Sequence, residues 1–156
     1  MQIVGHLKSL INILISYALS AYFAGVSICL FVGINDLLDN NYSRNIYPIL
    51  EFLLEIPKIS IVISGIIIIF TSVPCTAFII FSELLRIKYK SYYIIFGGIL
   101  GLVLIILFAA KDISLPPSYR DFKMFIQFTI SGAFAGWVYW RLAGRNAGRF
   151  FNRPAE

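Results

Sequence analysis

Charged residues are scarce in this chain, and its longest apolar runs contain none. Lys and Arg number 13 and Asp and Glu number 8, so only 13% of the residues are charged. Soluble domains carry about 25%. Uncharged runs cover residues 9–35, 59–82, 91–110 and 124–140. Proton relays and charge-coupled transport normally need an ionisable group inside such a run, so the sequence argues against both functions.

Histidine and cysteine are also rare, with one histidine and two cysteines in the chain. The one histidine, His6, lies outside the uncharged runs, which excludes bis-histidine haem ligation and a histidine-bearing metal cluster within one chain. Cys29 and Cys75 lie in different apolar runs and form no Cys-x-x-Cys pair, so a redox dithiol is excluded too. No Ser/His/Asp set and no Gly-rich phosphate loop is present. The sequence therefore predicts a protein that is not an enzyme and has no cofactor and no metal.

Hydrophobic residues, by contrast, make up 59% of the chain and gather in the four uncharged runs. A membrane-spanning helix needs about 20 apolar residues, and lipid requires a backbone whose hydrogen bonds are all internal. We predict an all-α membrane protein, a four-helix transmembrane bundle with spans at residues 9–34, 59–82, 91–110 and 124–143. The first run is too long for a cleaved signal peptide, so we expect it to be a retained span. The fourth is the shortest and reaches residue 143 only if Arg141 snorkels to the headgroups.

Basic residues orient the predicted bundle, because cytoplasmic loops retain Lys and Arg. They gather before the first run, between the second and third, and after the fourth: Lys8, Arg86, Lys88, Lys90, Arg141, Arg145, Arg149 and Arg153. Both termini are therefore expected to be cytoplasmic, with a basic tail at residues 144–156. The net charge of +5 is explained by this topology, and no nucleic-acid partner is predicted.

The first external link, residues 36–57, is the longest segment outside the spans. Pro48 and Pro57 bracket a predicted short amphipathic helix, on which Glu51 and Glu55 share a face at i,i+4. Such a helix is typical of an interfacial or re-entrant lid, and a binding site is the alternative.

Small residues recur at i,i+4 in the third and fourth spans. Gly97-x-x-x-Gly101 and Gly132-x-x-x-Gly136 are the clearest pairs, and a third glycine pair follows at positions 144 and 148. Small residues at this spacing let two helix backbones approach closely. The stripes serve either to close the chain's own bundle or to bind a second copy or another membrane protein.

Four arginines follow each other at every fourth position: Arg141, Arg145, Arg149 and Arg153. On a continuous helix they would form one basic stripe, for which anionic lipid headgroups are the natural partners. The alternative is that they simply anchor the chain on its cytoplasmic side.

Pro74 removes a backbone donor inside the second span and predicts a kink. Neighbouring hydroxyls are expected to satisfy the carbonyl that is freed around Phe70. If the protein conducts a neutral solute, the predicted pathway residues are Asn12, Thr71, Pro74 and Gln127.

The stretch Gly132-Ala-Phe-Ala-Gly-Trp-Val-Tyr-Trp-Arg-Leu-Ala-Gly-Arg-Asn-Ala-Gly148 resembles the last span of small uncharacterised inner-membrane proteins of α-proteobacteria. The resemblance covers this segment alone. It implies a bacterial inner-membrane location and brings no activity. The paired cysteines of four-span disulfide-forming proteins and the intramembrane glutamate of small multidrug transporters have no counterpart in this chain.

Two main functional hypotheses follow from these features, and a third, a membrane enzyme that acts on lipids, would need catalytic residues at an interface, where only Glu51, Glu55, Asp112, Tyr119 and Arg120 are available. The first is a non-enzymatic accessory or interaction subunit of the inner membrane that packs through its small-residue helix faces. The alternative is an oligomeric channel or carrier for a neutral or apolar small solute.

Overall fold

The described part of the chain is entirely helical. The computed structural model describes residues 2–39, 47–109 and 119–147. Over these residues the chain forms four α-helices, α1 (Gln2–Asp39), α2 (Tyr47–Leu84), α3 (Lys90–Ala109) and α4 (Tyr119–Leu142), and the short 3-10 helix η1 (Gly144–Asn146). The predicted all-α class with four helices is confirmed.

Three of the helices in the described residues are long and apolar enough to cross a membrane. Their candidate spans are Leu10–Asn35 in α1, Leu50–Leu84 in α2 and Lys90–Phe108 in α3. Helix α4 carries Asp121, Lys123, Gln127 and Arg141, which make it more polar than the other three. It nevertheless packs closely along α3 and also contacts α1.

The distribution of side chains over the fold is the reverse of that in a water-soluble protein. Large apolar side chains point outward, as Ile69 (72% exposed) and Val73 (79% exposed) illustrate. The buried positions hold small and hydroxyl residues, among them Ser16, Ser60 and Ser131. In water this arrangement would forfeit the hydrophobic stabilisation of the fold, whereas in lipid the outer surface is solvated and small residues let helices approach. The chain is therefore a multi-pass membrane protein.

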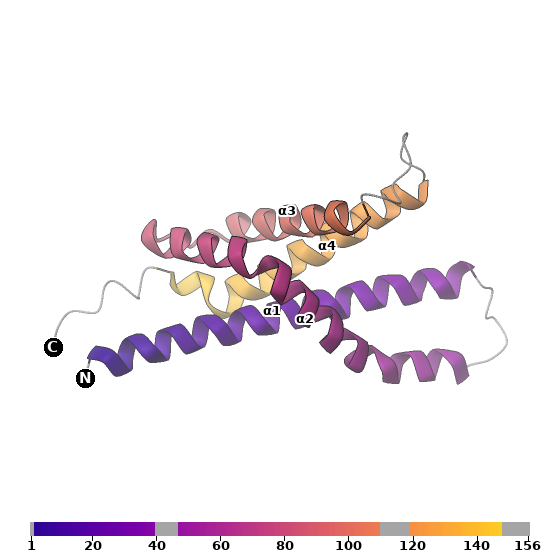
Figure 1. The fold of residues 1–156 in the computed structure, drawn as a ribbon, viewed down its shortest axis with the longest axis horizontal. Coiled ribbons are helices and arrows are strands. Elements are labelled where there is room, and N and C mark those ends of the chain that lie inside the picture. Colours follow the sequence, from indigo (N-terminus) through magenta and orange to yellow (C-terminus); the bar gives the residue numbers. More distant parts are fainter. Residues whose placement is uncertain (1, 40–46, 110–118, 148–156) are drawn as a thin grey trace.

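Helix α2 differs from the prediction for the first external link. Residues 47–57 do not form a separate short helix between two prolines, because Pro57 lies inside one continuous helix that runs to Leu84. Packing against α1 explains the continuity: the Phe52 ring lies on Gly33, and Ile56 is only 7% exposed. Proline removes a single backbone donor. In a helix that is held in place by packing, this bends the helix and does not end it. Figure 1 shows the changing direction of α2 along its length.

The turn between α2 and α3 is a Schellman motif. The amide of Ile87 donates to the Ser82 carbonyl (2.9 Å) and that of Arg86 donates to the Glu83 carbonyl (3.3 Å). Arg86 itself has a φ of 53°, the left-handed conformation that this motif requires. The tight turn brings α3 back along α2, so that the start of α1, this turn and the end of α4 all lie at one end of the bundle (Figure 1).

The C-terminal segment also differs from the prediction. Helix α4 ends at Leu142, and Ala147 has an extended conformation (φ −52°, ψ 143°), so no continuous helix carries an arginine stripe through this segment. The physical reason is a ring beneath it, since a Cβ on Gly144 would lie 2.7 Å from Cζ of Tyr93. The chain turns to cover this ring. Arg149, Arg153 and Gly148 lie outside the described residues.

Candidate functional site: a cavity inside the helix bundle

Glycines hold α3 and α4 against each other. A Cβ at Gly97 would overlap the backbone carbonyl of Gly132, and one at Gly136 would overlap that of Tyr93. Gly101 faces the Phe128 carbonyl in the same antiparallel register. Because only glycine leaves room for these carbonyls, the two helices lie at backbone contact distance. The structure thus places both glycine motifs in a contact within the chain.

Helix α1 packs against α2 and against α4 through small and hydroxyl side chains. Against α2, a Cβ on Gly25 would lie 2.8 Å from the carbonyl oxygen of Ser60, whose own hydroxyl donates to the Cys29 sulfur at 3.6 Å. Against α4, the Ser131 hydroxyl donates to the hydroxyl of Ser27 at 3.0 Å. Three seams of the bundle are therefore closed by close backbone approach or by hydrogen bonds, namely α3 with α4, α1 with α2 and α1 with α4.

Helices α2 and α3 meet in a different way, through aromatic rings. Phe78 stacks on Phe96, with ring centroids 3.5 Å apart, and on Tyr92 at 4.7 Å. Farther along the seam Phe70 meets Phe108 edge to face at 4.8 Å. Rings reach farther than the small residues of the other seams, so they bridge helices whose backbones stand apart.

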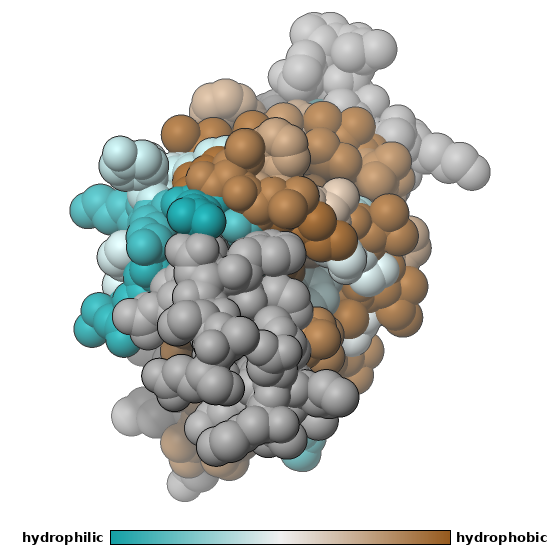
Figure 2. All heavy atoms as spheres, turned by 90° about the vertical axis from the view of Figure 1, so that its left-hand side faces the viewer, coloured by the Kyte–Doolittle hydropathy of each residue, from teal (hydrophilic) through white to brown (hydrophobic). Residues whose placement is uncertain are grey.

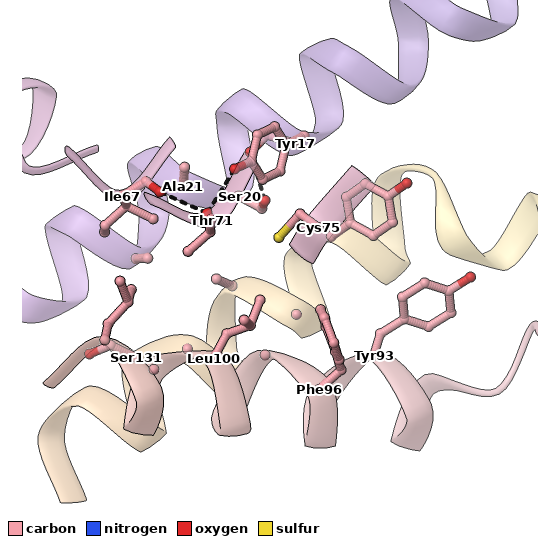
Figure 3. A pocket seen from close by; sticks show the side chains of 18 of the residues that line it. Tyr17, Ser20, Ala21, Ile67, Thr71, Cys75, Tyr93, Phe96, Leu100 and Ser131 are labelled. Carbon is pink, nitrogen blue, oxygen red and sulfur yellow. Dashed lines mark hydrogen bonds between the residues drawn. The ribbon is translucent and has the colours of Figure 1, made fainter. Parts of the chain in front are cut away.

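The wider spacing leaves a cavity of about 90 Å³ in the middle of the bundle, partly open to the outside. All four helices contribute to its wall (Figure 3). The lining consists of aromatic, aliphatic, small and hydroxyl or thiol side chains, which include Tyr17, Ser20, Ile67, Thr71, Cys75, Phe78, Tyr93, Phe96, Leu100, Ser131 and Tyr139. None of the residues that line this cavity carries a formal charge.

Most hydroxyl groups on the wall are already engaged with the protein, among them those of Tyr93 and Ser131. The hydroxyls of Tyr17 and Thr71 share a hydrogen bond of 2.7 Å between α1 and α2, and the Thr71 hydroxyl donates to the Ile67 carbonyl at 2.7 Å (Figure 3). Ser20 donates to the Tyr17 carbonyl at 2.7 Å. Among the described residues no buried side-chain nitrogen or oxygen lacks a hydrogen-bond partner. A molecule in the cavity therefore meets a neutral wall with little hydrogen-bonding capacity to spare.

The predicted pathway residues are not brought together. Thr71 lines the cavity, but Asn12 and Pro74 are exposed on the outer surface and the half-buried Gln127 is not part of the wall. The hydroxyls near Pro74 also do not serve the carbonyl of Phe70. They donate to carbonyls three or four residues earlier, as Thr76 does to Ser72 at 2.7 Å. Only a hydroxyl at position 73 or 74 could reach Phe70 in this way, and those positions are Val and Pro.

The aromatic contacts of the α2–α3 seam were not predicted from the sequence, although the spacing of Phe78 and Phe96 indicates one of them. Phe78 and Phe96 lie equally far along the chain from Ile87 in the turn, and in an antiparallel helix hairpin such positions face each other. Tyr17 and Cys75 had no comparable signal, because their meeting depends on the crossing of α1 and α2.

Basic side chains gather at one end of the bundle. Arg141 and Arg145 are exposed there, together with Arg86, Lys88 and Lys90 from the α2–α3 turn. The turn and α4 are tied together by the Trp140 indole, which donates to the Lys88 carbonyl at 2.8 Å. Figure 2 looks at this end and shows hydrophilic residues over one part of it, with hydrophobic residues over much of the rest of the described surface.

Comparisons of the chain with protein-family models, with curated proteins and with solved structures find no match. Within the described residues, no group of three or more His, Cys, Asp or Glu side chains comes together. The cavity, the seams and the surface of the described residues are therefore the features from which a function can be inferred.

Proposed function

We propose that the protein is a non-enzymatic membrane protein that binds a neutral, largely apolar molecule in the cavity of its helix bundle, as a carrier for such a molecule would. The observation that supports this proposal is the uncharged cavity wall to which all four helices contribute. Concave and mostly apolar sites with a few polar groups are the usual form of small-molecule sites. The cavity lies within a single chain, so binding does not require an oligomer.

The proposal excludes ions as the preferred ligand on energetic grounds. A charge placed among these side chains would lose its hydration and find no opposite charge on the wall. In such surroundings an isolated charge is strongly disfavoured. An apolar molecule instead replaces missing contacts, because an empty cavity costs about 24 cal/mol per Å³, or about 2 kcal/mol for this volume.

Filling the cavity tests this proposal. Ala135→Leu adds three carbon atoms to the wall, and Ala77→Leu adds the same atoms on the exposed face of α2. We expect mild-detergent purification followed by native mass spectrometry to detect a bound neutral molecule on the unmodified protein and on Ala77→Leu, but not on Ala135→Leu. If the molecule stays bound to Ala135→Leu, or if the unmodified protein carries none, the cavity is not its site.

The location and orientation belong to the same proposal. We propose a bacterial inner-membrane protein in which α4 is the fourth span and both termini are cytoplasmic. The side-by-side packing of α4 on α3 and the exposed basic residues at one end of the bundle support it. The exposed Arg141 and Arg145 are available to anionic headgroups at that end, and contact of Arg149 and Arg153 with the same headgroups stays a prediction from the sequence.

Reporter fusions test the orientation. A fusion at Lys88 is expected in the cytoplasm and one at Asn41 on the opposite side of the membrane. A fusion after residue 156 decides the role of α4, because it shares the compartment of Lys88 only if α4 crosses the bilayer. Recovery of this last fusion in the compartment of Asn41 would show that the protein has three spans.

The accessory role predicted from the sequence is the second candidate, and it now depends on the outer face of α2. The glycine motifs of α3 and α4 are used within the chain, but a Cβ on Gly65 would have no atom within 4 Å. A helix of a second copy or of another membrane protein can approach at that point. Crosslinking in native membranes tests this role: Gly65→Leu should abolish a crosslinked product that Ala77→Leu, at an exposed position of the same helix, retains. An unchanged product with Gly65→Leu would contradict it.

A further inference from the structure

We infer that the ligand of the cavity is the hydrocarbon chain of a lipid, and that it enters sideways from the bilayer between α2 and α3, past the ring of Phe78. This inference rests on the proposed function and deepens it by naming the ligand class and the route. The route follows from the way in which the four helices are held together.

The α2–α3 seam is the weak seam of the bundle. The other three neighbouring pairs make close backbone contacts, supported by glycines and by interhelical hydrogen bonds. Across the α2–α3 seam the described ring contacts form two sets, one around Phe78 and one between Phe70 and Phe108. Between them lie Cys75 on α2 and Leu100 on α3, both of which line the cavity.

Phe78 is the side chain that can open this seam. Its ring lies against Phe96 and Tyr92, meets Tyr93 edge to face at 5.6 Å, and belongs to the cavity wall. Because the Phe78 ring fills the space between α2 and α3, its rotation alone would open a gap there. Opening any other seam requires two helices to separate. Side-chain rotation of this kind is fast compared with helix motion.

The position and chemistry of the cavity select a hydrocarbon chain over other neutral molecules. The cavity lies alongside the apolar spans of α1, α2 and α3, so the medium outside the α2–α3 seam is the acyl region of the bilayer. The hydroxyls of Tyr17, Ser20, Thr71, Tyr93 and Ser131 on its wall are already hydrogen-bonded, so a polar solute would find few partners to replace its hydration. The cavity of about 90 Å³ is large enough to hold the end of a hydrocarbon chain.

The thiol of Cys75 provides a direct test, because it faces the cavity from α2 (Figure 3), whereas Cys29 is buried against Ser60 and is not part of the wall. The protein carrying Cys29→Ala is reconstituted in phosphatidylcholine vesicles. It is then treated either with a straight-chain alkyl methanethiosulfonate or with the charged trimethylammonium-ethyl reagent. Intact-protein mass spectrometry measures the rate of modification. We expect the alkyl reagent to modify Cys75 and the charged reagent not to do so.

Variants at the seam give the second measurement. Phe78→Ala is expected to accelerate the reaction with the alkyl reagent about tenfold, the effect of losing one or two ring contacts, and Phe78→Trp to slow it. Phe81→Ala removes an exposed ring from the same helix and should leave the rate unchanged. If Phe78→Ala does not fold, Phe78→Leu replaces it in the rate measurement. The comparison of the two reagents does not need a variant at position 78.

Two results would overturn the inference: equal modification by both reagents, which indicates entry from water, or no modification by the alkyl reagent in any Phe78 variant. These results are distinct from failure of the proposed function. A neutral molecule retained by the purified protein while Cys75 resists the alkyl reagent refutes the route alone. Modification of Cys75 in a protein that carries no bound molecule refutes the proposed function alone.

Discussion

Gly97→Ala is expected to destabilise the protein by about 1–3 kcal/mol, the range for inserting a carbon where no space exists. The new Cβ would overlap the carbonyl oxygen of Gly132, which belongs to the backbone and cannot rotate away. The α3 and α4 helices must separate, and their contacts along the whole glycine seam weaken together. The change is measured as the free energy of unfolding or as the melting temperature in detergent.

The adjacent glycine provides the matched control. A Cβ on Gly98 would lie 3.6 Å from the nearest atom, Cγ2 of Thr129, which is an ordinary van der Waals contact. Gly98→Ala should therefore stabilise the protein by about 0.5–1 kcal/mol, because alanine loses less backbone entropy in a helix. Since both changes add the same methyl group to α3, their opposite signs would isolate the packing of α4. A Gly97→Ala protein that melts at or above the temperature of the unmodified protein would contradict this account of the seam.

Tyr93→Ala is expected to cost about 3–5 kcal/mol, the usual range for removing a large buried ring. Tyr93 is only 2% exposed, and its hydroxyl donates to the Ile87 carbonyl in the α2–α3 turn at 2.9 Å. Its ring packs with Tyr139 and Ala143 and lies under Gly144. One side chain thus joins the turn, α4 and the segment that follows α4. Thermal melting in detergent measures the loss.

One further variant separates the ring of Tyr93 from its hydrogen bond, and a variant of an exposed tyrosine serves as the control. Tyr93→Phe keeps the ring and removes the hydrogen bond to Ile87, so about 1 kcal/mol is expected. Tyr89→Ala removes a tyrosine that is 80% exposed near the same turn and should change stability by less than about 0.5 kcal/mol. Equal losses for Tyr89→Ala and Tyr93→Ala would show that the buried ring does not hold these segments together.

The predicted spans illustrate how far sequence reasoning reaches in a membrane protein. The uncharged runs at residues 9–35, 59–82 and 91–110 correspond to the candidate spans of α1, α2 and α3, because the length and polarity of a run are local properties. The ends of helices were harder to predict. Pro57 did not end a helix, since packing on α1 held residues 50–58 in place, and α4 stopped at Leu142 because the following segment covers Tyr93.

The candidate site shows the same division. The glycine pairs of α3 and α4 were evident from their spacing, but the sequence left open whether they contact each other or another protein. Tyr17 gave no sign of sharing a cavity with Cys75 and Phe78, because it lies on a different helix and only packing sets the relative rotation of the two helices.

By itself, the sequence determined that this is a membrane protein, that its described fold is helical and that its apolar runs contain no Asp, Glu, Lys, Arg or His. These properties follow from the composition of consecutive residues, which decides the preferred solvent. The tertiary structure alone decided which small residues meet, that aromatic rings instead of backbone contacts join α2 to α3, and that a neutral cavity results. Those outcomes depend on distances between helices, and the distances are set by side chains that lie far apart in the chain.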